Sequence, residues 1–166
     1  METSSPEFRI RPARREDAAA VALLGNKLNL QHGLPETFTE ASVLRDGFDG
    51  PLTFSLLVAA HGERVVGYAL YHPQYNSDRP GWGLWLVDLF VEPELRGRGL
   101  GRRLLAAVAA EAVASGFVSL WWGVTSANRN ARDFYAALGA RDEDARILEL
   151  DGAALAKLAR QADTPS

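Results

Sequence analysis

The stretch from Trp85 to Ala114 most constrains how this chain of 166 residues folds. Its first part, WLVDLFV, is an apolar run of the length of a buried strand and is soon followed by Pro93. Its last part, RRLLAAVAAEAVA, is rich in Ala and Leu and contains neither Gly nor Pro, which predicts a helix. The segment RGRGLG between them therefore forms a turn that leads from a strand into a helix.

This turn has the composition of a phosphate-binding loop. Gly97, Gly99 and Gly101 allow backbone conformations that strain other residues, and they leave the backbone amides uncovered. At the start of a helix, several N–H groups lack partners and the positive end of the helix dipole points outward. Four arginines add positive charge: Arg96, Arg98, Arg102 and Arg103. The pattern predicts a pyrophosphate cradle, and the alternative is a glycine-rich turn that binds nothing.

Residues that the loop lacks exclude two classes of phosphate site. A Walker loop needs Gly-Lys-Ser/Thr at the start of the helix, where this chain has Arg102 and Arg103, so nucleotide hydrolysis is not expected. A dinucleotide fingerprint would place its last glycine at position 102, which is also occupied by Arg102.

Composition narrows the class of protein further. With 47% hydrophobic and 23% charged residues, we expect a single domain over residues 1–166, with an ordered core from about 7 to 161. The net charge of −3 argues against a nucleic-acid partner. No apolar segment has the length of a membrane span, and METSSPEF does not resemble a secretory signal, so we expect a cytoplasmic protein without a membrane partner.

Two absent features limit the chemistry. The chain has no cysteine, which excludes disulfides, thiolate metal sites and a cysteinyl thioester, and we expect no metal. It also has no GxSxG motif to supply a serine nucleophile. In an acyl-transfer enzyme, direct attack of the acceptor on the donor would remain.

The order of expected elements indicates an α/β (α+β) fold with a mixed, centrally parallel sheet and helices on both faces. Strands are predicted over residues 8–13, 53–61, 64–75, 81–91, 117–124 and 146–151. Helices are predicted over 14–31, 39–48 and 100–114. Residues 126–140 form a loop that leads into a helix ended by Gly139, and residues 152–161 form a last helix or pack across a partner.

The pattern V-x-P-x-x-R-G-x-G-x-G from Val91 to Gly101 resembles the acyl-CoA signature of the GNAT N-acetyltransferases, carried by Arg96, Gly99 and Gly101. The segments FRIRPARREDAAAV, LWLVDLFVEPELRGRGLG and NRNARDFYAALGA extend the resemblance over nearly the whole chain. Within this superfamily the chain most resembles the spermidine/spermine (diamine/thialysine) N-acetyltransferase-like group, including in the segments TEASVLRDGF and RILELDGAALAKLA.

The resemblance implies the GNAT fold, whose central sheet of about six to seven strands has splayed central parallel strands and flanking helices. It also implies acetyl-CoA as cosubstrate, a small-molecule primary amine as acceptor, direct attack in a ternary complex and a homodimer. Thialysine (aminoethyl-cysteine), another lysine-like amino acid and a diamine are the acceptors we expect, in that order. One alternative is an enzyme that acetylates protein N-termini or lysines, and another is a GNAT module that binds acyl-CoA without turnover.

Two residues are candidates for catalysis. Tyr135 resembles the family tyrosine that gives a proton to the departing thiolate. The alternative is that Tyr135 is a tyrosine of the core without a catalytic role. Asp88 is the one carboxylate in an apolar strand. It either holds the amine, directly or through a water that accepts its proton, or forms a structural ion pair.

The resemblance implies further contacts with coenzyme A and with the acceptor. Those with coenzyme A are Leu89, Phe90, Val91, Arg96, Gly97, Arg98, Gly99, Leu100, Gly101, Arg102, Asn128, Asn130 and Ala131. The N–H of Phe90 or Val91 would also serve the oxyanion. Those with the acceptor are Gln31, His32, Trp121 and Trp122, of which at most one tryptophan lines the cleft. His32 is either a base or a surface histidine.

The chain departs from the polyamine enzymes at two places. Val87 stands where they carry a glutamate before the aspartate, and residues 142–145 lack a tryptophan that is typical near their last strand. Both departures argue against a polyamine as the substrate.

Overall fold

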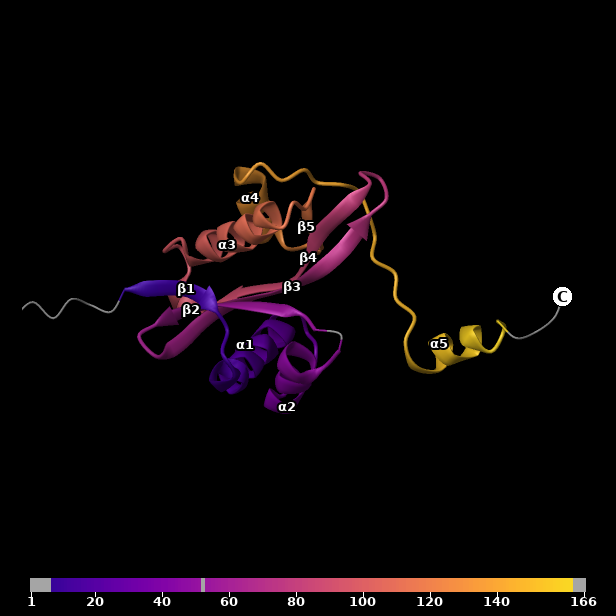
Figure 1. Cartoon of the computed structure of the whole chain (residues 1–166), viewed down its shortest axis with the longest axis horizontal. Helices are drawn as coiled ribbons and strands as arrows, with labels where there is room; N and C mark the ends of the chain where they lie inside the picture. Colours follow the sequence, from indigo (N-terminus) through magenta and orange to yellow (C-terminus); the bar gives the residue numbers. More distant parts are fainter. Residues whose placement is uncertain (1–6, 52, 163–166) are drawn as a thin grey trace, which may run out of the picture. The chain divides into compact units, whose positions relative to one another are not determined.

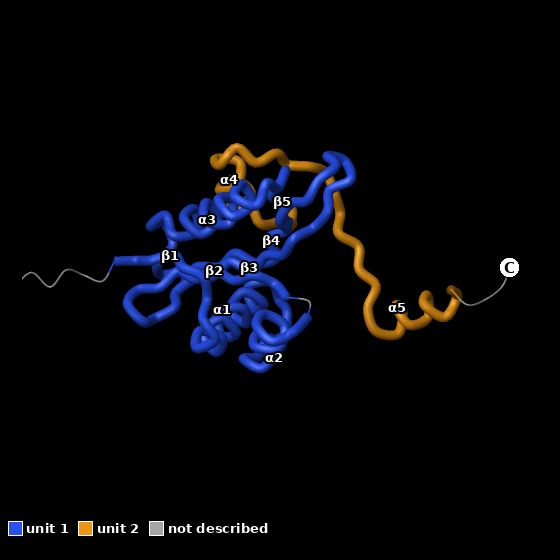
Figure 2. Tube along the Cα trace, in the orientation of Figure 1, with its two compact units in different colours: residues 1–122 blue, residues 123–166 orange. Residues whose placement is uncertain are grey.

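The computed structural model describes residues 7–51 and 53–162, and the chain divides into two compact units after Trp122 (Figures 1 and 2). That both units form one acetyltransferase domain stays a prediction. The ordered core expected over about 7–161 likewise stays a prediction.

The first unit is a five-stranded mixed sheet with helices on both faces. The strands run in the order β1 (Phe8–Pro12), β2 (Ser55–His61), β3 (Arg64–Asn76), β4 (Gly81–Val91) and β5 (Leu120–Trp122). The first four are antiparallel neighbours, and β5 is parallel to β4. Helices α1 (Ala18–Gln31) and α2 (Glu40–Leu44) cover one face, and α3 (Leu100–Ala114) covers the other (Figure 1). The predicted α/β class with a mixed sheet is confirmed.

The second unit contains α4 (Arg129–Ala137) and α5 (Gly152–Ala159). The strand predicted over 146–151 is wrong, because residues 141–151 have no regular structure. Ile147 and Leu148 are 74% and 89% exposed. Apolar alternation is not sufficient for a strand, which also needs a neighbouring edge to accept its backbone hydrogen bonds. The described sheet therefore has five strands instead of about six to seven.

The core between the sheet and α1 is built from apolar side chains of both layers. The helix contributes Ala18, Val21 and Leu24 at the helical spacing that the sequence predicts. We call the buried set the α1 cluster; its members are Ala18, Val21, Ala22, Leu24, Val43, Leu56, Val58, Val65, Tyr68, Leu70 and Phe90.

The segment between α1 and α2 is held against α1. The Asn26 side chain donates to the Phe38 carbonyl at 2.8 Å and accepts the Phe38 N–H at 3.0 Å. A Cβ at Gly25 would lie 2.5 Å from the Phe38 ring. Glycine inside a helix is less favourable than alanine by about 1 kcal/mol, and here it makes room for Phe38 against the α1 cluster. Thr39 caps α2 as predicted, because its hydroxyl accepts the N–H of Ser42 at 3.1 Å.

A β-bulge at Val87 sets the direction in which Asp88 points. Leu70 of β3 is paired with Asp88, and its neighbour Tyr71 is paired with Leu86, which leaves Val87 as an extra residue of β4. Paired residues of neighbouring strands project to the same face, and successive residues alternate. Leu70 belongs to the α1 cluster, whereas Tyr71 bonds a side chain of α3. Leu86 therefore faces α3 and Asp88 faces α1, and a regular strand would have placed both on one face.

Candidate active site

Asp88 and Tyr68 form a hydrogen-bonded pair on the face of the sheet that α1 covers. The Tyr68 hydroxyl donates to Asp88 Oδ2 at 2.8 Å. Burial raises the pKa of Asp88, while the Tyr68 hydrogen bond and the charge of His32 lower it, and burial prevails. Burial and the neighbouring Asp88 carboxylate raise the pKa of Tyr68, so the phenol remains protonated and able to donate.

The sheet separates the two candidate tryptophans. Trp121 is paired with Trp85 of β4, and their rings meet edge to face at a centroid distance of 6.3 Å. Trp122 is paired with Leu86, which faces α3. Strand alternation therefore places Trp121 on the face of Asp88 and Trp122 on the opposite face.

The end of α1 meets the loop that follows β4. Gln31 is the last residue of α1, and its Oε1 accepts from Arg96 Nη2 at 3.2 Å. Arg96 also donates from Nε to the Val91 carbonyl at 2.9 Å and lies over the Phe90 ring. His32 follows as the exposed C-cap of α1. The Arg96 side chain thus ties the loop to β4 and α1.

The loop presents a continuous row of backbone donors. Gly97 and Gly99 have φ values of +76° and +78°, in the region that favours glycine, and α3 begins at Leu100. Leu95 and Arg96 still donate to the carbonyls of Glu92 and Pro93. For the six N–H groups from 97 to 102, by contrast, no acceptor occurs among residues 7–51 and 53–162. Such a row at a helix start fits an anion.

Charged side chains flank this row unequally. Arg98 and Arg102 are exposed beside it. Arg103 instead donates to the Phe8 carbonyl at 2.9 Å and thereby links α3 to β1. Positive charge at the row therefore comes chiefly from Arg98, Arg102 and the helix dipole.

The edge of β4 next to this loop is open. β5 pairs with β4 only at Leu84–Leu86, and no other described strand covers β4 beyond that point on this side. The Glu92 N–H donates to the Val66 carbonyl of β3. Because donors alternate along a strand, the N–H groups of Leu89 and Val91 point toward the open edge, and that of Phe90 points toward β3.

Sequence reasoning missed Glu92, which anchors the start of the loop. It is only 4% exposed and forms ion pairs with Lys27, at 2.9 Å, and with Arg64. These contacts join α1, β3 and the end of β4. An acidic residue directly after an apolar strand was the available signal, but its two partners are distant in the sequence. Sequence reasoning also missed the role of Tyr68, which it could assign only as a core or interface aromatic.

The remaining candidates lie in the second unit. Asn128 is the N-cap of α4, and its Oδ1 accepts the Ala131 N–H at 3.1 Å. Asn130 is exposed in the first turn of α4. Tyr135 lies in the last part of this helix with its ring 5.1 Å from that of Phe134, and desolvation raises the pKa of Tyr135.

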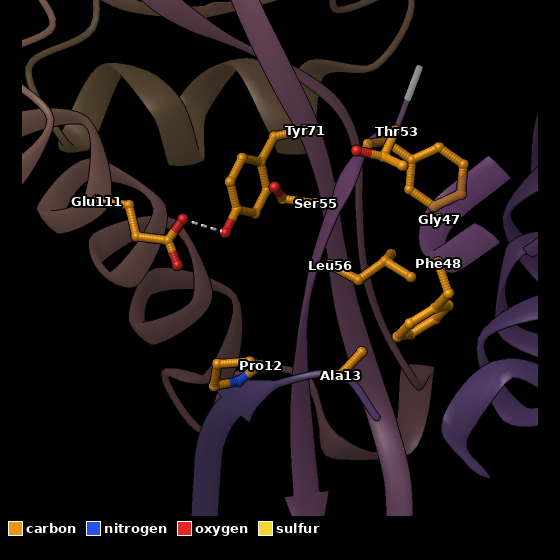
Figure 3. Close-up of a pocket in the computed structure, with 10 residues that line it drawn as sticks. Pro12, Ala13, Gly47, Phe48, Thr53, Ser55, Leu56, Tyr71 and Glu111 are labelled. Atoms are coloured by element: carbon orange, nitrogen blue, oxygen red, sulfur yellow. Dashed lines mark hydrogen bonds between the residues drawn. The ribbon is translucent and has the colours of Figure 1, made fainter. Parts of the chain in front are cut away.

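A separate hollow of about 320 Å³ lies in the first unit (Figure 3). Pro12, Phe48, Leu56 and Tyr71 are among the residues that line it, and none of the predicted site residues does so. The Tyr71 hydroxyl donates to Glu111 of α3 beside it, as the dashed line in Figure 3 marks.

Two other kinds of feature are absent from the described residues. Within the described ranges, no three His, Asp or Glu side chains group in a way that could hold a metal ion. No helix in the part of the chain that the structure describes is both long and apolar enough to cross a membrane.

Known proteins resemble this chain in sequence and in fold. Residues 26–140 match the acetyltransferase (GNAT) family. A thialysine N-epsilon-acetyltransferase of Bos taurus is 32% identical over 164 residues, which cover 90% of this chain and 96% of that protein.

Two solved structures share the fold. An integron cassette protein from the mobile metagenome of V. cholerae has a TM-score of 0.78 at 21% identity and covers 92% of this chain and 98% of its own. An aminoglycoside N-acetyltransferase solved in complex with CoA has a TM-score of 0.70 at 18% identity, with coverage of 91% and 99%. Together with the match in sequence, these findings confirm the resemblance drawn from the sequence. The chain belongs to the GNAT family of acetyltransferases.

Proposed function

We propose that this enzyme transfers the acetyl group of acetyl-CoA to a primary amine of a small molecule by direct attack in a ternary complex. The observation that carries the proposal is the row of six N–H groups from 97 to 102, for which the described residues offer no acceptor, next to the open edge of β4. A pyrophosphate needs several convergent donors, and an extended amide-containing arm can add to an open strand edge.

The residues of the first unit fit both parts of this cosubstrate. The loop from Gly97 to Arg102 would hold the pyrophosphate through its backbone, with Arg98 and Arg102 supplying charge. The N–H groups of Leu89 and Val91 would pair with the pantetheine arm. Of the two donors expected for the oxyanion, Val91 is favoured over Phe90, because its N–H points to the open edge.

Bound acetyl-CoA supplies a thioester carbonyl that an amine can attack. On the acceptor side, Asp88 would hold the amine, and Trp121, Gln31 and His32 would line its approach. In the second unit, Tyr135 would give its proton to the departing thiolate, while Asn128, Asn130 and Ala131 would contact coenzyme A where α4 begins. The raised pKa of Tyr135 keeps its phenol protonated at neutral pH, as a proton donor requires.

Support for the acceptor class comes from the relative in cattle, which is named for thialysine, a lysine-like amino acid. Asp88 is preceded by Val87 instead of a second acidic residue, which argues against a polyamine as the acceptor. We therefore propose that thialysine or another amino acid with a terminal amine is preferred to a diamine.

A thiol-release assay tests this function. The full chain is given acetyl-CoA with thialysine, lysine, ornithine, diamines, aminoglycosides or lysine peptides. Saturable release with an amino acid that carries a terminal amine, at kcat/KM above that for diamines, is the expected result. Turnover with peptides alone would favour a protein acetyltransferase, and tight binding of acetyl-CoA without any release would favour a non-catalytic module.

Gly99→Ala is expected to weaken coenzyme A binding about 10- to 100-fold. A side chain at φ +78° strains the backbone by about 1–3 kcal/mol, and relief of that strain turns the N–H groups away from the ligand. Isothermal titration of the variant with coenzyme A measures the effect.

Gly116→Ala is the matched control, because Gly116 directly follows the C-cap of the same helix at φ +69°, and a Cβ there would meet no described atom within 4 Å apart from its chain neighbours. It should lose a similar amount of thermal stability and retain coenzyme A affinity. An equal loss of affinity in both variants would contradict the assignment of the loop.

We further propose that the enzyme is a homodimer. Ile147, Leu148, Leu150, Leu155 and Leu158 are exposed along the second unit, and such runs commonly mark surfaces that another chain covers. Leu148→Asp is expected to convert the dimer to a monomer in sedimentation velocity. Val113→Asp, a control at another strongly exposed apolar position, in α3, should leave the dimer intact. A monomeric parent protein would contradict this proposal.

A further inference from the structure

We propose that Tyr68 is a positioning residue for Asp88: its hydroxyl holds Oδ2 of the carboxylate and leaves Oδ1 available to the amine of the acceptor. This inference rests on the proposed function, in which Asp88 holds the amine. It assigns to a buried tyrosine of the α1 cluster a role in orienting the group that meets the substrate.

The pairing of the two side chains is mutual. The Tyr68 side chain is fully buried, and its hydroxyl donates to Asp88 Oδ2 at 2.8 Å. In residues 7–51 and 53–162, Asp88 is the one hydrogen-bond partner of this hydroxyl, and Tyr68 is the one donor to the Asp88 carboxylate. Oδ1 therefore retains its capacity to accept from a ligand.

The backbone brings the pair together from two strands. Tyr68 is paired with Phe90 and Leu70 with Asp88, so Tyr68 and Asp88 are diagonal neighbours across β3 and β4. They share a face only because the bulge at Val87 turns Asp88 toward α1. A Cβ at Gly25 of α1 would lie 3.2 Å from the Tyr68 hydroxyl. The absence of a side chain at Gly25 therefore leaves space both for the Phe38 ring and for the Tyr68 hydroxyl.

Few charged groups face Asp88 from the elements around it. The Tyr68 hydroxyl of β3 donates a hydrogen bond to the Asp88 carboxylate, and His32 at the end of α1 interacts with this carboxylate electrostatically. Trp121 of β5 lies on the same face and is uncharged. A hydrogen bond to an ionised carboxylate favours the ionised form. Removal of the Tyr68 hydroxyl should therefore make Asp88 harder to ionise and free to rotate, although a phenylalanine ring would fill the same volume.

The experiment compares Tyr68→Phe with Tyr71→Phe. Tyr71 is another buried tyrosine of β3, but its hydroxyl donates to Glu111 on the opposite face of the sheet. Carbon-13 NMR of the aspartate carboxyl groups follows the titration of Asp88 in the full chain without acetyl-CoA. The Asp88 midpoint should rise by about one pH unit in Tyr68→Phe and stay unchanged in Tyr71→Phe.

Kinetics supply a second readout. Tyr68→Phe should raise KM for the amine about tenfold with a smaller change in kcat, and should move the acid limb of kcat/KM to higher pH by the same amount as the NMR midpoint. An unchanged Asp88 midpoint in folded Tyr68→Phe, or an equal shift in Tyr71→Phe, would overturn the positioning role.

The titration also separates this inference from the proposed function. If no amine in the panel releases thiol from the parent protein, the proposed function fails and the role of Tyr68 toward an amine fails with it. If the panel succeeds and the midpoint does not move, only the inference about Tyr68 fails. Should Tyr68→Phe not fold, the ring carbon that bears the hydroxyl of Tyr68 in the parent protein is followed instead. It should titrate with the midpoint of Asp88, and a flat signal would overturn the proposal.

Discussion

Asp88→Asn is expected to lower kcat/KM for the amine by about 100- to 1,000-fold while the protein remains folded. Asparagine retains the shape of the side chain and can still accept from Tyr68, but it cannot pair with an ammonium group or take part in its deprotonation. Steady-state kinetics with the preferred amine measure the loss, and coenzyme A binding should be unchanged.

The same substitution should raise thermal stability at neutral pH. Burial raises the pKa of Asp88 in the folded state above its ordinary value near 3.8. Between that value and the folded pKa, the folded state binds more protons than the unfolded state, so stability falls as the pH rises. Asparagine carries no charge and avoids this loss. Calorimetry at about pH 4 and pH 7 should therefore show that the gain in Tm is larger at pH 7.

Asp17→Asn is a matched control, because Asp17 is also buried but its pKa shifts in the opposite direction. Burial alone would raise the pKa of Asp17, yet bonds from the Arg11 side chain and the Arg14 N–H lower it. This carboxylate stabilises the fold above its unfolded pKa, and that contribution is lost as the pH falls through the folded pKa. Asp17→Asn should lose about 1–3 kcal/mol of stability and keep kcat. Equal kinetic losses in both variants would contradict the role of Asp88.

The sequence predicted the elements around the loop well. The predicted strand over 81–91 and helix over 100–114 coincide with β4 and α3, because Gly and Pro bound long and uniform patterns there. The signature residues Arg96, Gly99 and Gly101 likewise marked a loop whose two glycines at 97 and 99 adopt positive φ. These are local properties, which a single sequence carries.

Features that depend on pairing between distant segments could not be predicted. The bulge at Val87 is defined by the register of β4 against β3, and nothing in WLVDLFV marks it. Sequence alone therefore left open whether Asp88 faces a cleft or forms a structural ion pair. It also could not show that Tyr68 contacts Asp88. The error at 146–151 has a similar origin, since the apolar alternation of RILELD carries no information about a partner strand.

Tyr135→Phe is expected to lower kcat by about 100- to 10,000-fold, with the affinity for coenzyme A retained. The phenol is the proposed donor to the departing thiolate, and phenylalanine keeps the ring but has no proton to give. Desolvation raises the pKa of Tyr135, so the parent enzyme should keep its activity at pH values where an ordinary tyrosine begins to ionise. Any basic limb that Tyr135 causes in the kcat profile should disappear in the variant.

The leaving group offers a sharper test of this role. An acetyl thioester with a more acidic thiol needs less protonation as it departs, so it should restore part of the lost rate in Tyr135→Phe and change the parent rate little. Tyr71→Phe controls for the loss of a buried hydroxyl elsewhere and should retain kcat with both donors. If kcat of Tyr135→Phe stays within about threefold of the parent, another group protonates the thiolate, and Tyr135 serves only the packing of α4.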